Sequence, residues 1–140
     1  MMRNIRGTNT APEIRLRRAL HRIGLRFRLH SKELPGKPDI VFPKYRAVVF
    51  THGCFWHRHD GCRFATSPKT RPDFWEKKFA SNVERDVKVQ ETLLREGWRV
   101  GVVWECSLRK SEDVNEAALE VANWLNDATA IFEFGSFDNK

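Results

Sequence analysis

The sequence has no long apolar run, no internal repeat and no segment rich in glycine and serine. A membrane-spanning helix needs about 18 or more consecutive apolar residues, and the N-terminal stretch MMRNIRGTNT has no apolar core of the kind found in secretory signals. We therefore expect a cytoplasmic protein that does not enter a membrane. Without linkers or repeats, the 140 residues are expected to form one domain, with an N-terminal arm at 1–9 and a C-terminal tail at 128–140.

Cysteine is scarce, and acidic residues are outnumbered by basic ones. The three cysteines cannot all pair. In a reducing compartment Cys54 and Cys62, which lie near histidines, are better suited to bind a metal than to form a disulfide. Lysine and arginine together number 25 against 18 aspartates and glutamates, a net charge of +7. This excess indicates a polyanionic partner, although charge alone supports only non-specific association.

Hydrophobic periodicity and turn signals predict a mixed α/β chain, with a central mixed β-sheet flanked by helices. A capping box at Thr10 begins the first helix, and Gly24 ends it. The expected elements are a helix at 10–24, strands at 25–29, 39–42 and 45–50, a helix at 72–98 that is interrupted early, a strand at 99–104 and a helix at 112–126. We expect Trp98, Trp104 and Trp124 in the core, and His21 and His30 on the surface without partners.

The stretch VVFTHGCFWHRHDGC, residues 48–62, ends an apolar strand in a loop rich in histidine and cysteine. Cys54, His59 and Cys62 are close enough in sequence for one loop to offer two thiolates and an imidazole to a single ion. A structural zinc site takes four protein ligands, and Cys106, just after the strand at 99–104, is the remaining cysteine. We predict a Cys3His zinc site. The alternative is that Cys106 is a small buried apolar residue and the other cysteines are incidental.

Phe55 and Trp56 are unusual residues for this polar loop. A loop held by zinc can keep two aromatic side chains in solvent next to basic residues. There they could stack on nucleic-acid bases or wedge between them. The alternative is that both rings pack against the edge of the sheet.

Asp39 opens the first hairpin strand, where an acidic metal ligand is expected in nucleases of the restriction-endonuclease type. Those enzymes carry (Asp/Glu)-x-Lys on the next strand, whereas this chain has Thr51-His52 there. If the hairpin turn has two residues, Asp39 opposes Val48, and His52 lies on the same face further along. Asp39 could then hold Mg²⁺ while a histidine takes a proton from water or stabilises charge on phosphate.

Three segments resemble the very-short-patch repair (Vsr) DNA mismatch endonucleases: GKPDIVFPKYRAVVFTHGCFWHRH, RPDFWEKKFASNVERD and GWRVGVVWEC. The resemblance extends from Arg3 to Leu125. It implies a bacterial enzyme with a restriction-endonuclease-like fold that nicks double-stranded DNA 5′ to the thymine of a T:G mismatch, the product of 5-methylcytosine deamination. It also implies catalytic Mg²⁺, structural Zn²⁺, a nucleoid location and downstream repair proteins as partners. Because a single-strand nick needs only one active site, we expect a monomer.

The resemblance also implies roles for catalytic residues. Asp39 matches the metal-binding aspartate, and Thr51 matches the residue that supplies a carbonyl to Mg²⁺. His57 matches the histidine proposed to activate water, and His52 matches the one that assists at the phosphate. Glu13 matches a helix glutamate near the active site, although a capping box by itself accounts for a glutamate at this position.

By the same resemblance, the zinc ligands are Cys54, His59, Cys62 and Cys106. The aromatic wedge that enters DNA next to the mismatch is matched by Phe55, Trp56 and Trp75. Lys78 and Asn82, which share one helical face, match side chains that read the mismatched pair, and Met2 matches an N-terminal residue that also reaches it. The chain departs from the family in having RHDGC where relatives often have a denser histidine run.

Other functions stay open at this point. One is a zinc-stabilised DNA-binding module without catalysis. Another is a thiol enzyme that uses Cys54 and His57, which lie three residues apart in the loop. A third is a nicking endonuclease of broader mismatch specificity, because the sequence carries no readable code for bases.

Overall fold

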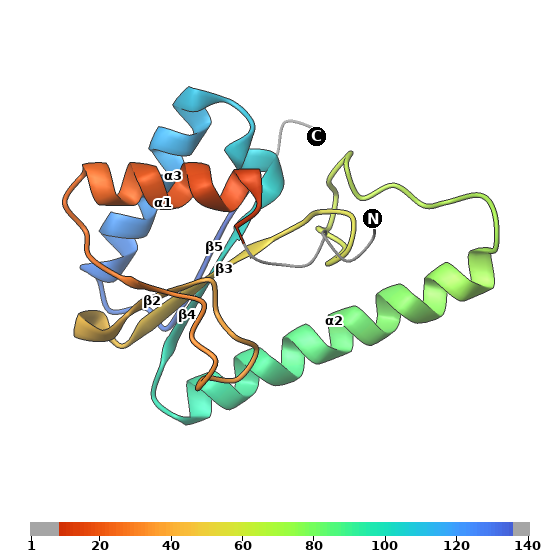
Figure 1. The fold of residues 1–140 in the computed structure, drawn as a ribbon. Helices are drawn as coiled ribbons and strands as arrows, with labels where there is room; N and C mark the ends of the chain where they lie inside the picture. The colour runs from red at the N-terminus through yellow and green to blue at the C-terminus, as the bar shows by residue number, and fades with distance from the viewer. Residues whose placement is uncertain (1–8, 136–140) are drawn as a thin grey trace.

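A five-stranded mixed sheet forms the centre of this computed structural model, which describes residues 9–135 (Figure 1). Along the chain the elements are α1 (Ala11–Arg22), β1 (Arg28–Leu29), β2 (Ile40–Phe42), the 3-10 helix η2 (Pro43–Tyr45), β3 (Ala47–His52), α2 (Pro72–Arg95), β4 (Arg99–Trp104), the 3-10 helix η3 (Glu105–Leu108), α3 (Ser111–Leu125) and β5 (Ile131–Phe134). The strands lie in the order β1-β2-β3-β4-β5, antiparallel from β1 to β3 and parallel from β3 to β5. The predicted α/β fold of restriction-endonuclease type is confirmed.

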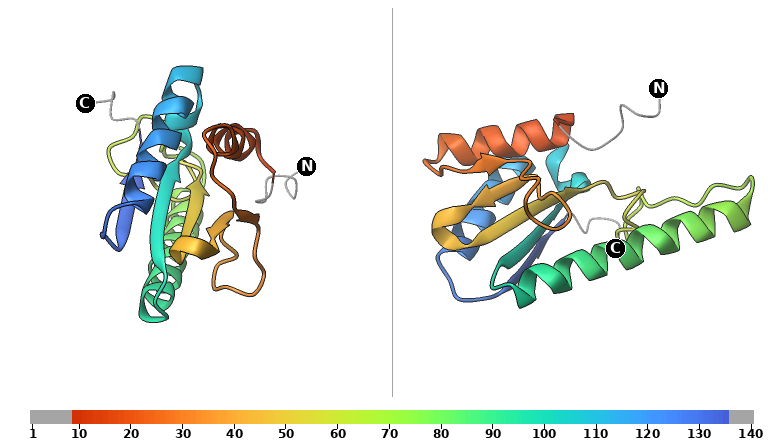
Figure 2. Two further views of the ribbon diagram at one scale, coloured as in Figure 1. Left: turned by 90° about the vertical axis from the view of Figure 1, so that its left-hand side faces the viewer. Right: turned by 60° about the horizontal axis from the view of Figure 1, so that its bottom comes forward.

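Helices cover both faces of the sheet. α1 and α3 pack together on one face, and α2 runs along the other (Figures 1 and 2). Val49 of β3 belongs to the core beneath α1 and α3, whereas Val48 and Phe50 belong to the core that includes Leu93 of α2. β3 and β4 are therefore buried on both sides, which accounts for their nearly continuous apolar sequences.

The first helix begins as the sequence predicts. Thr10 is the N-cap, and its side-chain oxygen accepts a hydrogen bond from the backbone N–H of Glu13 at 3.4 Å. Leu16 and Leu20 are buried on the face that packs against the sheet, and Gly24 follows the last turn with a φ of 101°. This geometry places Glu13, in the first turn of α1, on the same buried face.

The turn between β2 and β3 is longer than the two residues expected. It consists of η2 followed by Arg46 in a left-handed conformation with a φ of 49°, so β3 starts at residue 47 rather than 45. Val48 pairs with Val41 instead of Asp39. The expected register is therefore wrong by two positions. Because the shift is even, Asp39 keeps the face of the sheet that was predicted for it.

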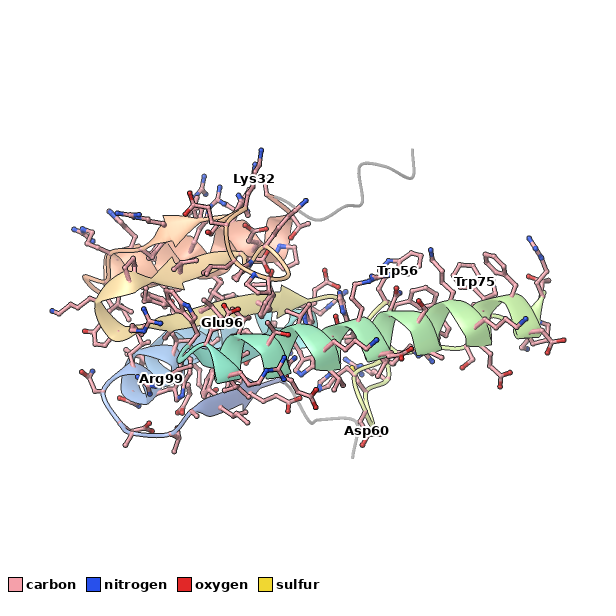
Figure 3. The ribbon with its side chains drawn as sticks, turned by 90° about the horizontal axis from the view of Figure 1, so that it is seen from below. Lys32, Trp56, Asp60, Trp75, Glu96 and Arg99 are labelled. Carbon is pink, nitrogen blue, oxygen red and sulfur yellow. The ribbon has the colours of Figure 1, made fainter. Side chains whose placement is uncertain are left out.

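α2 is one continuous helix, so the predicted early interruption is wrong. Its C-terminal part packs against the sheet, and its N-terminal part extends beyond it (Figures 1 and 3). The buried residues are Phe79 and Leu93, whereas Val83 and Val87, expected on the buried face, are exposed. Helical periodicity identifies residues that share a face but not the point where the sheet ends. No helix in residues 9–135 is long and apolar enough to cross a membrane.

The sequence predicts a tail from residue 128, but residues 131–134 form the strand β5. This strand pairs in parallel with β4, and Phe132 stacks on Trp124 of α3 with ring centroids 5.2 Å apart. An alternating pattern of four residues is too short to predict a strand, so the pairing with β4 decides its conformation. The predicted burial of Trp104 and Trp124 is confirmed, and Trp98 is partly buried.

Candidate active site and metal centre

One cavity of about 470 Å³ gathers the predicted catalytic residues of β3 and the loop after it. Its walls come from β3, from the loop that follows β1 and from the middle of α2. Gly36 allows that loop to approach α2, because a Cβ at this position would lie only 2.4 Å from a methyl group of Val89. The residues that line the cavity and carry predicted roles are Asp39, Thr51, His52 and His57.

Asp39 is held in place by β3. Its Oδ2 accepts hydrogen bonds from the backbone N–H of Thr51 at 2.7 Å and from the Thr51 hydroxyl at 3.2 Å. Burial raises the pKa of Asp39 to about 6; the Thr51 hydrogen bonds oppose this rise, and the nearby Glu13 carboxylate adds to it. Two carboxylates that are desolvated together favour a bound cation, which offsets both their repulsion and their lost hydration.

Glu13 reaches the same place from α1. Its side chain is fully buried, and its Oε1 accepts a hydrogen bond from the backbone N–H of Asn9 at 3.0 Å. Its Oε2 accepts one from Arg17 at 3.3 Å and contacts Nε2 of His30. The ligand atoms of Glu13, His30 and Asp39 all lie within 4.8 Å of one another. The expectation that His30 is a surface residue without a partner is therefore wrong.

The two histidines after β3 stack on each other, with ring centroids 3.9 Å apart and ring planes 4° apart. Nδ1 of His57 lies 2.7 Å from a carboxylate oxygen of Asp86 on α2. We assign the proton to Nδ1 because the carboxylate can only accept it, which leaves the Nε2 lone pair available. Burial and, to a lesser extent, the electrostatic interaction with His57 lower the pKa of His52 to about 3, so His52 is uncharged at neutral pH.

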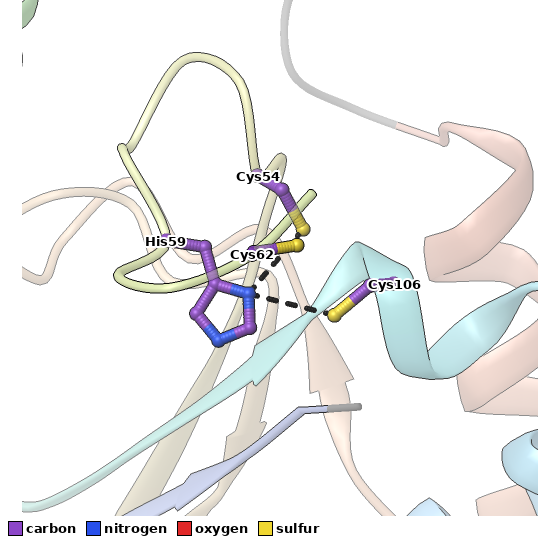
Figure 4. A group of neighbouring side chains, drawn as sticks. All are labelled: Cys54, His59, Cys62 and Cys106. Carbon is purple, nitrogen blue, oxygen red and sulfur yellow. Dashed lines mark hydrogen bonds between the residues drawn. The ribbon is translucent and has the colours of Figure 1, made fainter. Parts of the chain in front are cut away.

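The four predicted zinc ligands meet beside the end of β4 (Figure 4). Cys54, His59 and Cys62 come from the loop after β3, and Cys106 comes from η3. Nδ1 of His59 lies 3.7 Å from Sγ of Cys54 and 3.5 Å from Sγ of Cys106, and the four ligand atoms lie within 4.8 Å of one another. Three sulfurs and one imidazole nitrogen form a ligand set that zinc takes in structural sites.

Cys54 is poorly suited to nucleophilic catalysis. Its side chain is buried, and a hydrogen bond with Cys106, together with burial, raises the pKa of its thiol above the ordinary value. A nucleophilic cysteine needs a lowered pKa and access to solvent, so the geometry does not support the thiol-enzyme alternative. Neighbouring buried thiols ionise when a cation holds them, so the donor set fits a metal ion.

A row of aromatic rings connects this Cys3His cluster to the cavity. His59 stacks on Trp104 with centroids 4.2 Å apart, and Trp104 contacts His52 edge to face at 5.3 Å. Trp104 also donates a hydrogen bond from Nε1 to Glu133 of β5 at 2.6 Å. The same tryptophan therefore packs against a candidate zinc ligand and a candidate catalytic residue.

The predicted wedge residues gather where α2 extends beyond the sheet, as the positions of Trp56 and Trp75 in Figure 3 show. Phe55 lies 5.0 Å from Trp56 and 5.8 Å from Trp75, measured between ring centroids. Beneath them Phe79 is buried, 5.1 Å from Phe55, and the Arg58 guanidinium lies 4.0 Å from the Phe79 ring centre. The three predicted rings are half-buried and pack on one another and Phe79, so packing on the sheet edge is not what holds them.

The side chains predicted to read bases lie on the same part of α2. Lys78 is exposed, and Asn82 donates a hydrogen bond to the backbone oxygen of Trp56 at 3.3 Å. Asn82 therefore also ties the helix to the loop that carries the rings. Met2 lies outside the described residues.

Sequence patterns did not predict the contacts of three residues near the cavity and the aromatic rings: His30, Phe79 and Asp86. Asp86 ends the segment NVERD, but its helical position gives no sign that it meets a histidine 29 residues earlier. Likewise, His30 contacts a glutamate 17 residues away. Three basic side chains also line the cavity: Lys32, Lys37 and Arg85.

Known proteins share extensive sequence similarity with this chain. The sequence model of the family described as DNA mismatch endonuclease Vsr matches residues 1–63. The type II nicking enzyme V.XorIIP of Xanthomonas oryzae pv. oryzae is 55% identical over 108 residues, which are 77% of this chain and 79% of that protein. The DNA mismatch endonuclease Vsr of Escherichia coli is 48% identical over 126 residues, 89% of this chain and 80% of that one.

A third relative covers still more of the chain. The type II nicking enzyme V.NmeAIP of Neisseria meningitidis is 41% identical over 128 residues, 91% of each protein. Identity at this level over most of both chains is accompanied by the mixed sheet that the sequence resemblance implies. This chain belongs to the Vsr family of DNA mismatch endonucleases.

Proposed function

We propose that this protein is a Mg²⁺-dependent endonuclease that nicks one strand of double-stranded DNA 5′ to the thymine of a T:G mismatch. The observation that carries the proposal is one cavity lined by Asp39, which lies beside the buried Glu13, and by His57, an imidazole that a third carboxylate, Asp86, orients. The names of the relatives, a mismatch endonuclease and nicking enzymes, support the same reaction class.

Asp39 and the backbone of Thr51 would hold the magnesium ion, with Glu13 beside them. Such an ion polarises the phosphate and lowers the pKa of a bound water. The basic side chains that line the cavity, Lys32, Lys37 and Arg85, suit a phosphate backbone that approaches this acidic centre.

Proton transfer from the attacking water is assigned to His57. The hydrogen bond to Asp86 fixes the ring and leaves Nε2 to accept the proton, and the carboxylate stabilises the imidazolium that forms. His52, stacked on one face of His57, keeps that face away from water. Because its pKa is about 3, His52 can assist at the phosphate only as a neutral hydrogen-bonding group.

Replacing Asp86 with asparagine is expected to lower kcat about a hundredfold, because general-base catalysis contributes about that much or more. Asparagine keeps the shape of the side chain but cannot stabilise the imidazolium. Single-turnover nicking would measure the effect, and DNA affinity should stay unchanged. Glu84→Gln, an exposed carboxylate on the same helix, is the control. Equal nicking by Asp86→Asn and wild type would contradict the assignment.

We further propose that Zn²⁺ occupies the Cys3His cluster and has a structural role. Its ligands come from the first half of the loop after β3 and from η3, so the ion would fix the segment that carries Phe55 and Trp56. The aromatic cluster would then meet the DNA as one preformed unit that enters the duplex at the mismatch, with Lys78 and Asn82 reading the mismatched pair.

Substituting Trp56 with alanine is expected to weaken binding to mismatched DNA by roughly tenfold to a hundredfold, since a stacked base is worth about 1–3 kcal/mol. Binding to matched duplex should change less, because no base step is opened there. Fluorescence anisotropy with both duplexes measures the difference. Val87→Ala, an exposed apolar residue of α2 outside the aromatic cluster, is the matched control. An equal loss on both duplexes would count against the wedge.

The proposed function is tested by nicking of a panel of duplexes that contain each mismatch in several flanking contexts, with and without Mg²⁺. Zinc-loaded protein should cut the thymine strand of the T:G duplex, at its 5′ side, only when Mg²⁺ is present. Binding without cutting would point to a DNA-binding module instead. Equal cutting of all mismatches would indicate a broader specificity. A single cavity suffices for one nick, so we propose a monomer that acts on chromosomal DNA in the bacterial cytoplasm, where the repair proteins that complete the patch would follow it.

A further inference from the structure

His30 lies beside two carboxylates, those of the buried Glu13 and the partly buried Asp39. Its backbone N–H donates a hydrogen bond to the carbonyl oxygen of Asp39 at 3.0 Å, which fixes its main chain beside the start of β2. Its ring reaches in the other direction, where Nε2 contacts Oε2 of Glu13. His30 therefore connects Asp39, the residue before β2, to Glu13 in the first turn of α1.

The backbone of His30 supports a specific role for its ring. Its φ is 48°, in the left-handed region that costs a residue with a side chain about 1 kcal/mol or more. Structures retain such conformations when the surroundings fix them, and they cluster at functional sites. Here the conformation lets the main chain bond to Asp39 while the ring contacts Glu13.

We propose that His30 is a direct nitrogen ligand of the active-site cation, which completes a Glu13–His30–Asp39 site. The proposal rests on the proposed nuclease function and adds a ligand to it. The three ligand atoms already lie within 4.8 Å of one another. Two ligands on opposite sides of an ion with bonds of about 2.1 Å are separated by roughly 4.2 Å, so a small adjustment of side chains is enough.

Each of the three residues has an atom suited to the ion. Oδ2 of Asp39 accepts both hydrogen bonds from Thr51, so Thr51 does not occupy Oδ1. Oε1 of Glu13 accepts a hydrogen bond from the backbone N–H of Asn9, and Oε2, which accepts one from Arg17, also contacts the His30 ring. The His30 side chain is 22% exposed and also lines the cavity, so solvent and substrate can reach the site.

An imidazole ligand changes which ion the site prefers. Mg²⁺ is a hard ion that takes oxygen ligands and keeps several waters. Nitrogen ligands favour transition metals, and Mn²⁺ is the transition metal in this series that also suits carboxylate ligands. We therefore expect this chain to bind Mn²⁺ more tightly than Mg²⁺ through His30, even though both ions can occupy the carboxylate pair.

The second group of neighbouring ligand atoms in the cavity is His52, His57 and Asp86. It is less suited to the ion, because the Asp86 carboxylate is already paired with Nδ1 of His57 at 2.7 Å and the His52 ring is stacked against His57. An ion there would also remove the imidazole that accepts the proton. The experiment below separates the two positions.

The test is electron spin-echo spectroscopy of Mn²⁺ added to the full-length, zinc-loaded protein, together with Mn²⁺ and Mg²⁺ titrations. A coordinated imidazole nitrogen modulates the Mn²⁺ echo. Wild type should show this modulation, and His30→Gln should lose it and bind Mn²⁺ roughly tenfold to a hundredfold more weakly. Mg²⁺ affinity should fall much less, by about threefold or under, because the carboxylates carry it.

Two further variants keep the result interpretable. His30→Asn suits the left-handed backbone but is too short to replace the ligand. It should therefore lose the modulation and bind Mn²⁺ more weakly, which tests the proposal even if His30→Gln folds poorly. His21→Gln changes an exposed histidine of α1 and should match wild type in modulation and affinity. Unchanged circular dichroism and zinc content would show that the variants fold.

Three results would overturn the proposal. They are the absence of nitrogen modulation in wild type, modulation that persists in both His30 variants, and modulation that disappears in His57→Gln instead. The proposed nuclease function can fail separately. If Mn²⁺ binds through His30 but neither ion supports nicking, the ligand stands and the nuclease proposal falls. If wild type nicks the T:G duplex while the His30 variants bind Mn²⁺ unchanged, the nuclease stands and the ligand falls.

Discussion

The substitution Asp39→Asn is expected to abolish nicking and, at the same time, to stabilise the protein in the absence of Mg²⁺. A catalytic cation contributes several kcal/mol to the transition state, and each 1.36 kcal/mol corresponds to about a tenfold change in rate. Loss of this ligand should therefore reduce nicking by about a thousandfold or more. Asparagine retains an oxygen that can accept the hydrogen bond from the Thr51 N–H, so the fold should persist.

The gain in stability follows from the raised pKa of Asp39. Burial raises it from 3.8 to about 6, so the folded state disfavours the carboxylate. A raised pKa gives stability that is present below the unfolded value and is lost as the pH rises through the folded value. At neutral pH the ionised Asp39 thus costs roughly 3 kcal/mol, at 1.36 kcal/mol for each pKa unit. The uncharged asparagine avoids this cost.

Urea unfolding of zinc-loaded protein without Mg²⁺, measured across a pH series, tests this expectation. The difference in free energy of unfolding between Asp39→Asn and wild type should be largest at neutral pH and should vanish below about pH 4. Glu33→Gln, an exposed carboxylate in the loop between β1 and β2, is the control and should not alter stability. Nicking by Asp39→Asn would contradict the role of Asp39 as a metal ligand. Lower stability of this variant at neutral pH would contradict the cost assigned to the ionised carboxylate.

Removal of the proposed zinc ligand Cys106, as in Cys106→Ser, is expected to release the ion and the loop of residues 53–71. Structural zinc contributes on the order of 10 kcal/mol to the order of its surroundings, so the melting temperature should fall by more than about 10 °C. The core beneath α1 and α3 shares no residue with the Cys3His cluster, so the sheet should still form. Nicking should disappear with the loop, because His57 lies in it.

Zinc content, thermal unfolding and limited proteolysis together test this expectation. In Cys106→Ser the proteolytic cuts should fall within residues 53–71, and added zinc should not restore resistance. Asp60→Asn, an exposed residue next to the ligand His59, should keep zinc and the wild-type melting temperature. Full zinc content in Cys106→Ser, or an unchanged melting temperature, would show that the cluster is not a zinc site.

The features that the sequence predicted well depend on neighbouring residues. The capping box of α1, the buried run of β3 and the grouping of Cys54, His59 and Cys62 each need only a short pattern, and Cys106 follows as the last remaining cysteine. The missed features join distant segments. The His30–Glu13 and His57–Asp86 contacts span 17 and 29 residues, and β5 becomes a strand through its pairing with β4. Side-chain periodicity carries no information about such meetings.

The part of α2 that extends beyond the sheet has a consequence for how this protein can diversify. Its aromatic residues rest on the loop and on Phe79, not on the two hydrophobic cores. Amino-acid replacements there do not require the sheet to repack, so we expect them to alter the proposed DNA contacts while the cavity around Asp39 and His57 stays intact. If the proposed DNA contacts are correct, exchange of the projecting part of α2 between homologues is a route to enzymes with new sequence preferences.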